Sequence, residues 1–376
     1  MRLFRTDGGF VEHGVARPGI PFLCDSDMEL VQAPNAFLRY VAITKGRTRS
    51  QNTWITYGQH LYEFFAFLEE NGLDWSAVTS AQVAAWRDSM LGRGCAKSTV
   101  NQRIRCVHRF YEWTQRGRTE GATPFTTEEV WVTRPTGFLA HVSAAGIKTA
   151  ANELTLRTFK RAPTFLVLDK AIAFLECLTP HSLKLMGYLA LCTGMRREEV
   201  TGLDYRVVPN PAGCDPQKAL PMVLNPRLTP TKGDKQRTVF IPYDLAAALW
   251  DYFCLEWPKR CAAYKSKHGN ESTRFFLSVY GEELSVRYLN NQFARASAKC
   301  GIRCHPHLLR HTFGTYELHR MVAAKGESKA LMWVRDRMGH SSISVTELYI
   351  HTADLLGNAD VDGYQAEICE ALRHGH

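Results

Sequence analysis

The amino-acid sequence predicts a mainly α protein of two domains, with a small β hairpin in the second domain. The chain has 376 residues, which is too long for one ordinary hydrophobic core and favours two domains with a linker. Apolar residues recur at helical spacing through much of the chain, as at Trp54, Tyr57, Leu61, Phe64 and Leu68. Two short extended runs in the second half, separated by a turn signal, indicate the hairpin.

Breaks in the periodic pattern set the expected domain boundaries. Residues 1–27 contain several Gly and Pro without a period, so we expect a loose N-terminal arm. Residues 28–120 carry successive amphipathic segments and are expected to form a compact helical domain. Pro and Gly interrupt residues 121–162, which we interpret as a linker, and residues 163–376 form the second domain.

The last helix of the first domain is expected to be basic. Val100, Ile104, Val107 and Tyr111 recur at helical spacing and are expected to face the core. Four cationic side chains point in other directions: Lys97, Arg103, Arg105 and Arg109. We interpret these four as candidate DNA contacts, and an ordinary solvated surface is the alternative.

Composition favours a polyanionic partner and gives no sign of a membrane segment. The net charge is +9, with 45% apolar and 22% charged residues. No apolar run reaches the roughly 18 residues that a membrane span requires, and the N-terminus lacks the apolar core of a secretory signal. Eleven cysteines without a framework indicate free thiols in a reducing compartment. We therefore expect a cytoplasmic, nucleoid-associated protein.

One cysteine and histidine cluster raises a metal site as an alternative. Cys300, Cys304, His305 and His307 lie within eight residues. A structural zinc site needs a second pair of ligands at the far end of a longer loop, and this segment has none. We therefore expect no metal there.

Two basic residues of the second domain lie at breaks in its pattern. Arg196 begins a short helix directly after the Thr193-Gly194 break that ends a buried helix. Lys232 lies in the turn between the extended runs 222–224 and 238–241, where Gly233-Asp234 is a turn signal. Both side chains are expected to be held at defined positions.

A His-x-x-Arg pair follows on a later helix. His307 and Arg310 are three residues apart and therefore share a helix face. An imidazole beside a guanidinium suits an oxyanion such as phosphate. Taken alone, the pair is explained more simply by a solvated helix edge, and its neighbours in the sequence decide the matter.

Two more polar side chains occur near the C-terminus. Gly339 is expected to end a helix over 329–338, and His340 follows it directly. The segment 344–347 has the pattern of a capping box, and it begins a short helix that carries Tyr349.

Together these segments resemble the tyrosine recombinase (phage integrase) family. The resemblance rests on four motifs in order: Thr193-Gly194-Met195-Arg196-Arg197-Glu198-Glu199-Val200, His307-Leu308-Leu309-Arg310-His311, Met338-Gly339-His340-Ser341-Ser342, and Tyr349 nine residues after His340. It covers residues 163–352 in detail and the helical domain before them by pattern. It implies a C-shaped DNA clamp of two domains, a helical core-binding (SAM-like) domain and a catalytic domain.

The resemblance also implies a role for each of six catalytic residues. Tyr349 would attack a phosphodiester and form a covalent 3′-phosphotyrosine, which needs neither metal nor ATP, so no cofactor is expected. Arg196 and Arg310 would hold the non-bridging oxygens, and His307 would act as a base or orienting group for the phenol. His340 would donate a hydrogen bond to the phosphoryl group. Lys232 would protonate the departing 5′-oxygen, with Lys235 as its rival.

Partners follow from the same resemblance. Double-stranded DNA is the expected substrate, bound by a homo-tetramer on two synapsed duplexes, with or without a second recombinase or an accessory DNA-bending protein. The apolar stripe Tyr364, Ile368 and Leu372 of a C-terminal helix over 361–373 is expected to dock on a neighbouring protomer rather than on its own domain. No membrane partner is expected.

Three other functions remain open from the sequence. A type IB topoisomerase would use the same tyrosine chemistry, but such enzymes usually carry Lys where this chain has His307. A DNA-binding regulator without catalysis would not need the intact set of six polar residues. A metalloprotein would depend on Cys300 and Cys304 alone. Integration, excision and transposition are not separated by the sequence.

Overall fold

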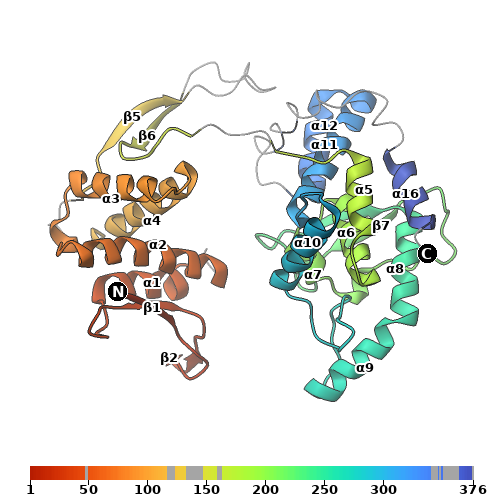
Figure 1. The fold of residues 1–376 in the computed structure, drawn as a ribbon, viewed down its shortest axis with the longest axis horizontal. Helices are drawn as coiled ribbons and strands as arrows, with labels where there is room; N and C mark the ends of the chain where they lie inside the picture. Colours follow the sequence, from red (N-terminus) through yellow and green to blue (C-terminus); the bar gives the residue numbers. More distant parts are fainter. Residues whose placement is uncertain are drawn as a thin grey trace. The chain divides into compact units, whose positions relative to one another are not determined.

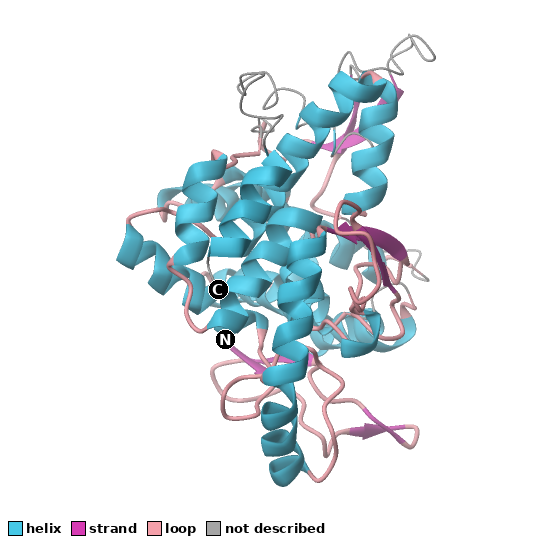
Figure 2. Ribbon diagram, turned by 90° about the vertical axis from the view of Figure 1, so that its right-hand side faces the viewer, coloured by secondary structure: helices cyan, strands magenta, loops and turns pink. Residues whose placement is uncertain are grey.

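The structure is a computed structural model that describes residues 1–46, 50–116, 123–132, 147–158, 163–339, 346, 349 and 364–374. The chain divides into two compact units, Met1–Lys160 and Arg161–His376. Helices dominate both units (Figures 1 and 2). The sheets formed by the described residues have two strands each, and the mainly α fold class is confirmed.

The first unit begins with strands where the sequence analysis expected a loose arm. Strand β1 (Arg2–Arg5) pairs antiparallel with β4 (Pro21–Cys24), and β2 (Val11–Glu12) pairs with β3 (Val15–Ala16). His13 and Gly14 both have positive φ, which suits the two-residue turn of a tight hairpin. The expectation of a loose arm was therefore wrong.

The helices of the first unit surround an aromatic core. They are α1 (Gln32–Arg39), a π-helical turn (Tyr40–Thr44), α2 (Gln51–Glu70), α3 (Ser80–Gly92) and α4 (Lys97–Thr114). Phe64, Trp86 and Phe110 are fully buried, and the rings of Phe64 and Trp86 lie 4.9 Å apart. A Cβ at Gly58 would lie 2.5 Å from Pro21, so this glycine lets β4 pack closely on α2.

A further hairpin lies within the segment interpreted as a linker. Strand β5 (Thr127–Val132) pairs antiparallel with β6 (Ile147–Asn152), and both belong to the first unit. Nearby, the side chain of Asn101 on α4 donates to the carbonyl of Leu156 at 2.8 Å and accepts from its N–H at 2.8 Å. This part of the segment is therefore attached to the helical domain.

The second unit is built around the buried helix α6 (His181–Thr193). The other α-helices among its described residues are α5 (Leu168–Glu176), α7 (Arg197–Thr201), α8 (Tyr243–Leu255), α9 (Trp257–His268), α10 (Val286–Cys300), α11 (Pro306–Lys325), α12 (Glu327–Met338) and α16 (Tyr364–His374). Strands β7 (Leu220–Leu224) and β8 (Arg237–Ile241) form the expected hairpin, with Met222 opposite Val239.

The C-terminal helix α16 packs on its own domain. Ile368 and Leu372 are buried in the core of the second unit, against α8 and α5. Arg373 also forms an ion pair with Asp244 at 3.0 Å. Ile368 and Leu372 of the apolar stripe thus pack within the chain, which corrects the expectation that the stripe docks on a neighbouring protomer.

Candidate functional site

Arg196 is fixed at the start of α7 by an acidic residue of the same helix. Its backbone N–H donates to Oε2 of Glu199 at 2.7 Å, and its Nη1 donates to Oε1 at 3.1 Å. Glu199 is 1% exposed. Burial raises the pKa of Glu199, but the hydrogen bonds and charges of Arg237 and Arg196 outweigh it and hold the pKa below its ordinary value. Arg196 is therefore held by a buried carboxylate.

Arg310 is a buried cation that projects from α11. It is 2% exposed, its Nη2 donates to the carbonyl of Met338 at 2.5 Å, and its Nη1 donates to the carbonyl of Gly194. Gly194 ends α6 with φ +64°, and a Cβ there would lie 2.4 Å from the Phe313 ring. Burial and the charge of Arg196 lower the pKa of Arg310 to about 9, so it stays charged at neutral pH.

Tyr349 is buried against the same helix. It is 1% exposed, and its hydroxyl lies 2.6 Å from Nδ1 of His311. A Cβ at Gly314 would lie 2.8 Å from both Tyr349 Cε1 and Met338 Sδ, so this glycine makes room for the tyrosine ring. Burial raises the pKa of Tyr349 to about 12, although Arg310 and Arg196 oppose this effect.

His311 lies at the nucleophile, where the sequence analysis had placed His307. Burial, together with the nearby His307 and Arg310, lowers the pKa of His311 to about 4, so its imidazole is neutral and can accept a proton. His307 is exposed one helical turn earlier, with its ring 4.5 Å from that of His311. Partial desolvation and Arg310 lower the pKa of His307 to about 4.

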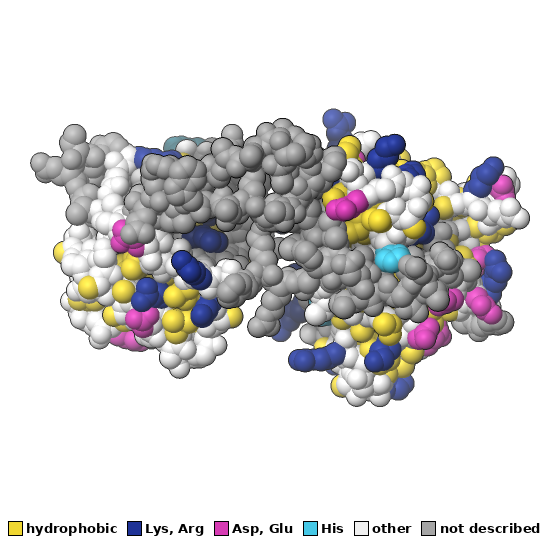
Figure 3. Space-filling model, turned by 90° about the horizontal axis from the view of Figure 1, so that it is seen from above, with side chains coloured by type: hydrophobic (Ala, Val, Ile, Leu, Met, Phe, Trp, Pro, Cys, Tyr) yellow, Lys and Arg dark blue, Asp and Glu magenta, His cyan; other side chains and the backbone are white. Residues whose placement is uncertain are grey.

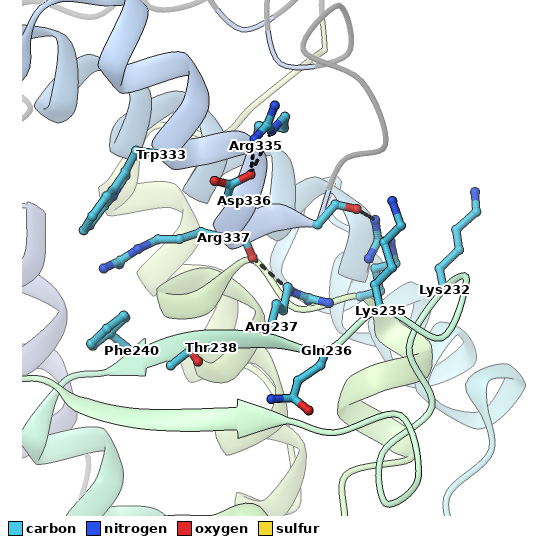
Figure 4. A pocket seen from close by; sticks show the side chains of 12 residues that line it. Lys232, Lys235, Gln236, Arg237, Thr238, Phe240, Trp333, Arg335, Asp336 and Arg337 are labelled. Carbon is cyan, nitrogen blue, oxygen red and sulfur yellow. Dashed lines mark hydrogen bonds and ion pairs between the residues drawn. The ribbon is translucent and has the colours of Figure 1, made fainter.

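Lys232 and Lys235 lie on the turn between β7 and β8, as expected. Gly233 and Asp234 between them both have positive φ. Both lysines, together with Arg196, line a cavity of about 710 Å³ between this turn and the end of α12 (Figure 4). The geometry therefore keeps both lysines as candidates for the proton donor. His340 lies outside the described residues.

The cationic residues of α4 are only partly available to a partner. Arg103 forms an ion pair with Glu63 at 3.3 Å, and Arg109 donates to the Tyr57 hydroxyl at 2.8 Å. Lys97 and Arg105 are exposed. On the face that Figure 3 shows, Lys and Arg side chains project from the described surface of both units.

The sequence analysis expected no metal at the cluster that contains Cys300 and Cys304. Cys304 is buried, and burial raises the pKa of its thiol to about 12. His305 caps α11, since its Nδ1 accepts from the Leu308 N–H at 3.1 Å. Within the described ranges, no three His, Cys, Asp or Glu residues are grouped so that they could hold a metal ion.

Two residues of the site were missed by the sequence analysis. His311 was overlooked because His307 matched the motif, although positions i and i+4 of a helix are neighbours. Arg237 begins β8 and binds Glu199 with both terminal nitrogens, at 2.7 and 2.5 Å. Its only signal in the sequence was its place just after the lysine-bearing turn.

No helix in the described part of the chain is long and apolar enough to cross a membrane.

Comparison with known proteins gives matches in both units. The model of the "Phage integrase family" matches residues 167–355, and that of the "Phage integrase, N-terminal SAM-like domain" matches residues 35–117. Tyrosine recombinase XerC of Serratia marcescens is 25% identical over 329 residues, which cover 86% of this chain and 90% of that protein. XerC of Mycobacterium bovis is 27% identical over 322 residues, covering 84% and 93%.

Two solved structures show the same fold. XerH site-specific recombinase bound to palindromic difH substrate has a TM-score of 0.57 at 17% identity, covering 83% of this chain and 80% of that one. The Tn1549 transposon integrase in complex with a circular intermediate DNA has a TM-score of 0.55 at 15% identity, covering 85% and 93%. Since one family model spans half of the sequence, this chain belongs to the phage integrase family.

Proposed function

We propose that this protein is a site-specific DNA recombinase that cleaves and rejoins strands through a covalent 3′-phosphotyrosine at Tyr349. The observation that carries the proposal is the meeting of Arg196, Arg310 and Tyr349 at one place, from segments far apart in the sequence. Both guanidiniums contact the end of α12, and both charges act on the Tyr349 hydroxyl. A tyrosine beside two fixed cations suits attack on a phosphodiester.

The cleavage step follows from these side chains. Tyr349 Oη bonds to phosphorus while the bond from phosphorus to the 5′-oxygen breaks. The phenol proton passes to Nδ1 of neutral His311, and Lys232, or Lys235, gives a proton to the departing 5′-oxygen. Arg196 and Arg310 stabilise the charge on the non-bridging oxygens. Rejoining is the reverse step with a 5′-hydroxyl as nucleophile, so no external energy source is needed.

His307 and His340 have supporting roles in this proposal. His307 is exposed beside Arg310 and His311, where it is suited to donate a hydrogen bond to the phosphoryl group or to exchange the proton that His311 accepts. His340 follows directly after Gly339, whose carbonyl accepts from Arg196 at 2.8 Å. We assign it the further hydrogen bond to the phosphoryl group that the family motif implies.

We further propose double-stranded DNA as substrate and a homo-tetramer on two synapsed duplexes as the working assembly. Recombinase–DNA complexes among the solved relatives support the first point, and a lambda integrase tetramer bound to a Holliday junction supports the second. The core-binding role of α4 depends on Lys97 and Arg105, with Arg103 and Arg109 partly engaged within the domain. The relatives' names do not favour the topoisomerase or the inactive regulator.

A nicked suicide duplex tests the proposal. Duplexes with a randomised core and a nick just downstream of each candidate scissile phosphate are incubated with the protein, and adducts that survive denaturation are selected and sequenced. We expect recovery of one sequence family, with the DNA attached to Tyr349 in the digested adduct. Adducts without sequence preference would favour a topoisomerase. No adduct from any duplex would contradict the proposed function.

A further inference from the structure

Three arginines bind successive backbone carbonyls at the end of α12. They come from β8, α11 and the start of α7. The contacts are Arg237 Nε to the Arg337 carbonyl at 2.9 Å, Arg310 Nη2 to the Met338 carbonyl at 2.5 Å, and Arg196 Nη2 to the Gly339 carbonyl at 2.8 Å. The last carbonyls of a helix lack partners within the helix and carry partial negative charge, which favours cations there.

Arg237 is the one of these three arginines to which the proposed mechanism gives no part. Its side chain is only 7% exposed, and all three of its nitrogens donate within the protein. Nη1 and Nη2 bind the two oxygens of Glu199, the same carboxylate that receives the backbone N–H and Nη1 of Arg196. Arg237 thus shares both of its anchors, Glu199 and the end of α12, with Arg196.

We propose that Arg237 is a positioning residue for strand cleavage, which fixes the guanidinium of Arg196 by holding Glu199 and the C-terminal end of α12 together. The inference rests on the proposed function, because it assigns Arg196 to the scissile phosphate.

Charge and hydrogen-bond geometry together explain why position 237 needs an arginine. Without Arg237, the buried Glu199 keeps one cationic partner, Arg196, which turns toward the carboxylate and away from a phosphate. A lysine at position 237 keeps the charge but cannot bind both oxygens of Glu199 and the Arg337 carbonyl in one plane. In the lysine variant, the site therefore keeps its net charge but loses the hydrogen bonds that fix Glu199 relative to the end of α12.

The backbone around this contact is shaped to admit both guanidiniums. Gly339 ends α12 with φ +62°, and a Cβ there would lie 3.2 Å from Arg237 Cδ and 3.5 Å from Arg196 Nη1. The guanidinium of Arg337 is stacked between two aromatic rings. Its Cζ lies 4.4 Å from the ring centroid of Phe240 and 4.2 Å from that of Trp333. The end of α12 is thereby attached to β8 twice (Figure 4).

Arg237 also lies two residues after Lys235. It forms the first position of β8, at the base of the turn that carries both candidate proton donors. The same side chain therefore fixes the turn relative to Arg196, so that the acid and the phosphate-binding cation keep one spacing.

The test compares Arg237→Gln with a matched control, Arg206→Gln. Arg206 also binds both oxygens of a buried carboxylate, Asp204, at 2.8 and 2.6 Å, but takes no part in the site. In single-turnover cleavage of the selected nicked duplex, Arg237→Gln should be about 10- to 100-fold slower than the wild type, the range expected when a catalytic group is misplaced. Its affinity for the duplex and the rate of Arg206→Gln should stay within about threefold of the wild type. A cleavage rate for Arg237→Gln within threefold of the wild type would overturn the inference.

Two further measurements separate positioning from a merely structural role. A duplex with a methylphosphonate at the scissile position carries one negative charge less, so the deficit of Arg237→Gln relative to the wild type should shrink on it. The double variant of Arg237→Gln and Glu199→Gln should be no slower than the slower single variant, because both act through one contact. An unchanged deficit on the methylphosphonate duplex would overturn the inference. So would a double variant whose loss of rate is the product of the two single losses, because Arg237 would then contact the phosphate directly and not act through Glu199.

If Arg237→Gln does not fold, Arg237→Lys replaces it in the test, because a lysine keeps a positive charge beside the buried Glu199. It should fold and lose at least about tenfold in cleavage, and a wild-type rate would overturn the inference. A wild-type chain that forms no adduct on any duplex would overturn the proposed function and the inference with it, whereas an active wild type with an equally active Arg237→Gln overturns the inference alone.

Discussion

Replacing Tyr349 with Phe removes one oxygen atom from a side chain that is buried in the second unit. The hydroxyl forms a hydrogen bond with His311 at 2.6 Å, and the net value of such a bond is about 0.5–1.5 kcal/mol. The ring keeps its apolar neighbours Phe313 and Met338. We therefore expect the free energy of unfolding to fall by about 1 kcal/mol and the Tm by about 2–4 °C, while adduct formation is abolished because the nucleophile is gone.

The matched control is Tyr316→Phe. Tyr316 is equally buried, and its hydroxyl accepts a hydrogen bond from the Leu168 N–H at 3.0 Å. It should lose a similar amount of stability and retain full cleavage of the nicked duplex. Thermal denaturation and a denaturing gel measure the two effects separately. An adduct formed by Tyr349→Phe would refute the reasoning and direct attention to Tyr316 or Tyr364 as the nucleophile.

Three further predictions concern the site and the core. Arg310→Lys should slow cleavage by about 10²- to 10³-fold although it keeps the charge. Arg197→Ala should slow cleavage far less, since Arg197 is exposed and paired with Glu198. Equal losses for the two variants would move the first motif by one residue. The lowered pKa of His311 means that the unfolded chain, with a histidine pKa of about 6.5, binds more protons between pH 6.5 and pH 4. Its contribution to stability is therefore present above pH 6.5 and lost as the pH falls toward 4, so the Tm of His311→Gln should fall less steeply over this range than that of the wild type. A parallel decline would show that His311 does not carry this linkage. Ile368→Ala should lower the free energy of unfolding by about 2–5 kcal/mol at every protein concentration, and a concentration-dependent loss in sedimentation or Tm would show that α16 packs on a second copy.

The helical parts of the fold were predictable because their apolar spacing is regular. The segment from Trp54 to Leu68 repeats often enough to define a buried face, and α2 covers it. The strands β2 and β3 have two residues each, which is too few for any period, so no pattern in the sequence indicated them. Apolar periodicity was therefore a sufficient guide for long elements and not for short ones.

The site was predictable as a set of residues rather than as a geometry. Motif order brought Arg196 and Arg310 together although 114 positions separate them, and the structure connects both to α12. Spacing alone could not choose between His307 and His311, because the rotation of α11 about its axis is set by tertiary packing, in which its own Phe313 is buried with Met338 of α12 and Tyr349. Arg237 was missed for the same reason, since only the folded hairpin brings it to Glu199. For α16, an apolar stripe does not state on which copy of the chain it packs.

The contacts between three arginines and the end of α12 constrain the length of that helix. The accepting groups are backbone carbonyls, so side chains at 338 and 339 do not supply them, and the constraint falls on where the helix stops. Each residue of an α-helix turns the backbone by about 100° and advances it by about 1.5 Å. Inserting or deleting one residue within α12 would therefore aim the carbonyls of 337–339 away from all three guanidiniums at once. We therefore expect the number of residues in α12 to tolerate less change than the identity of its side chains.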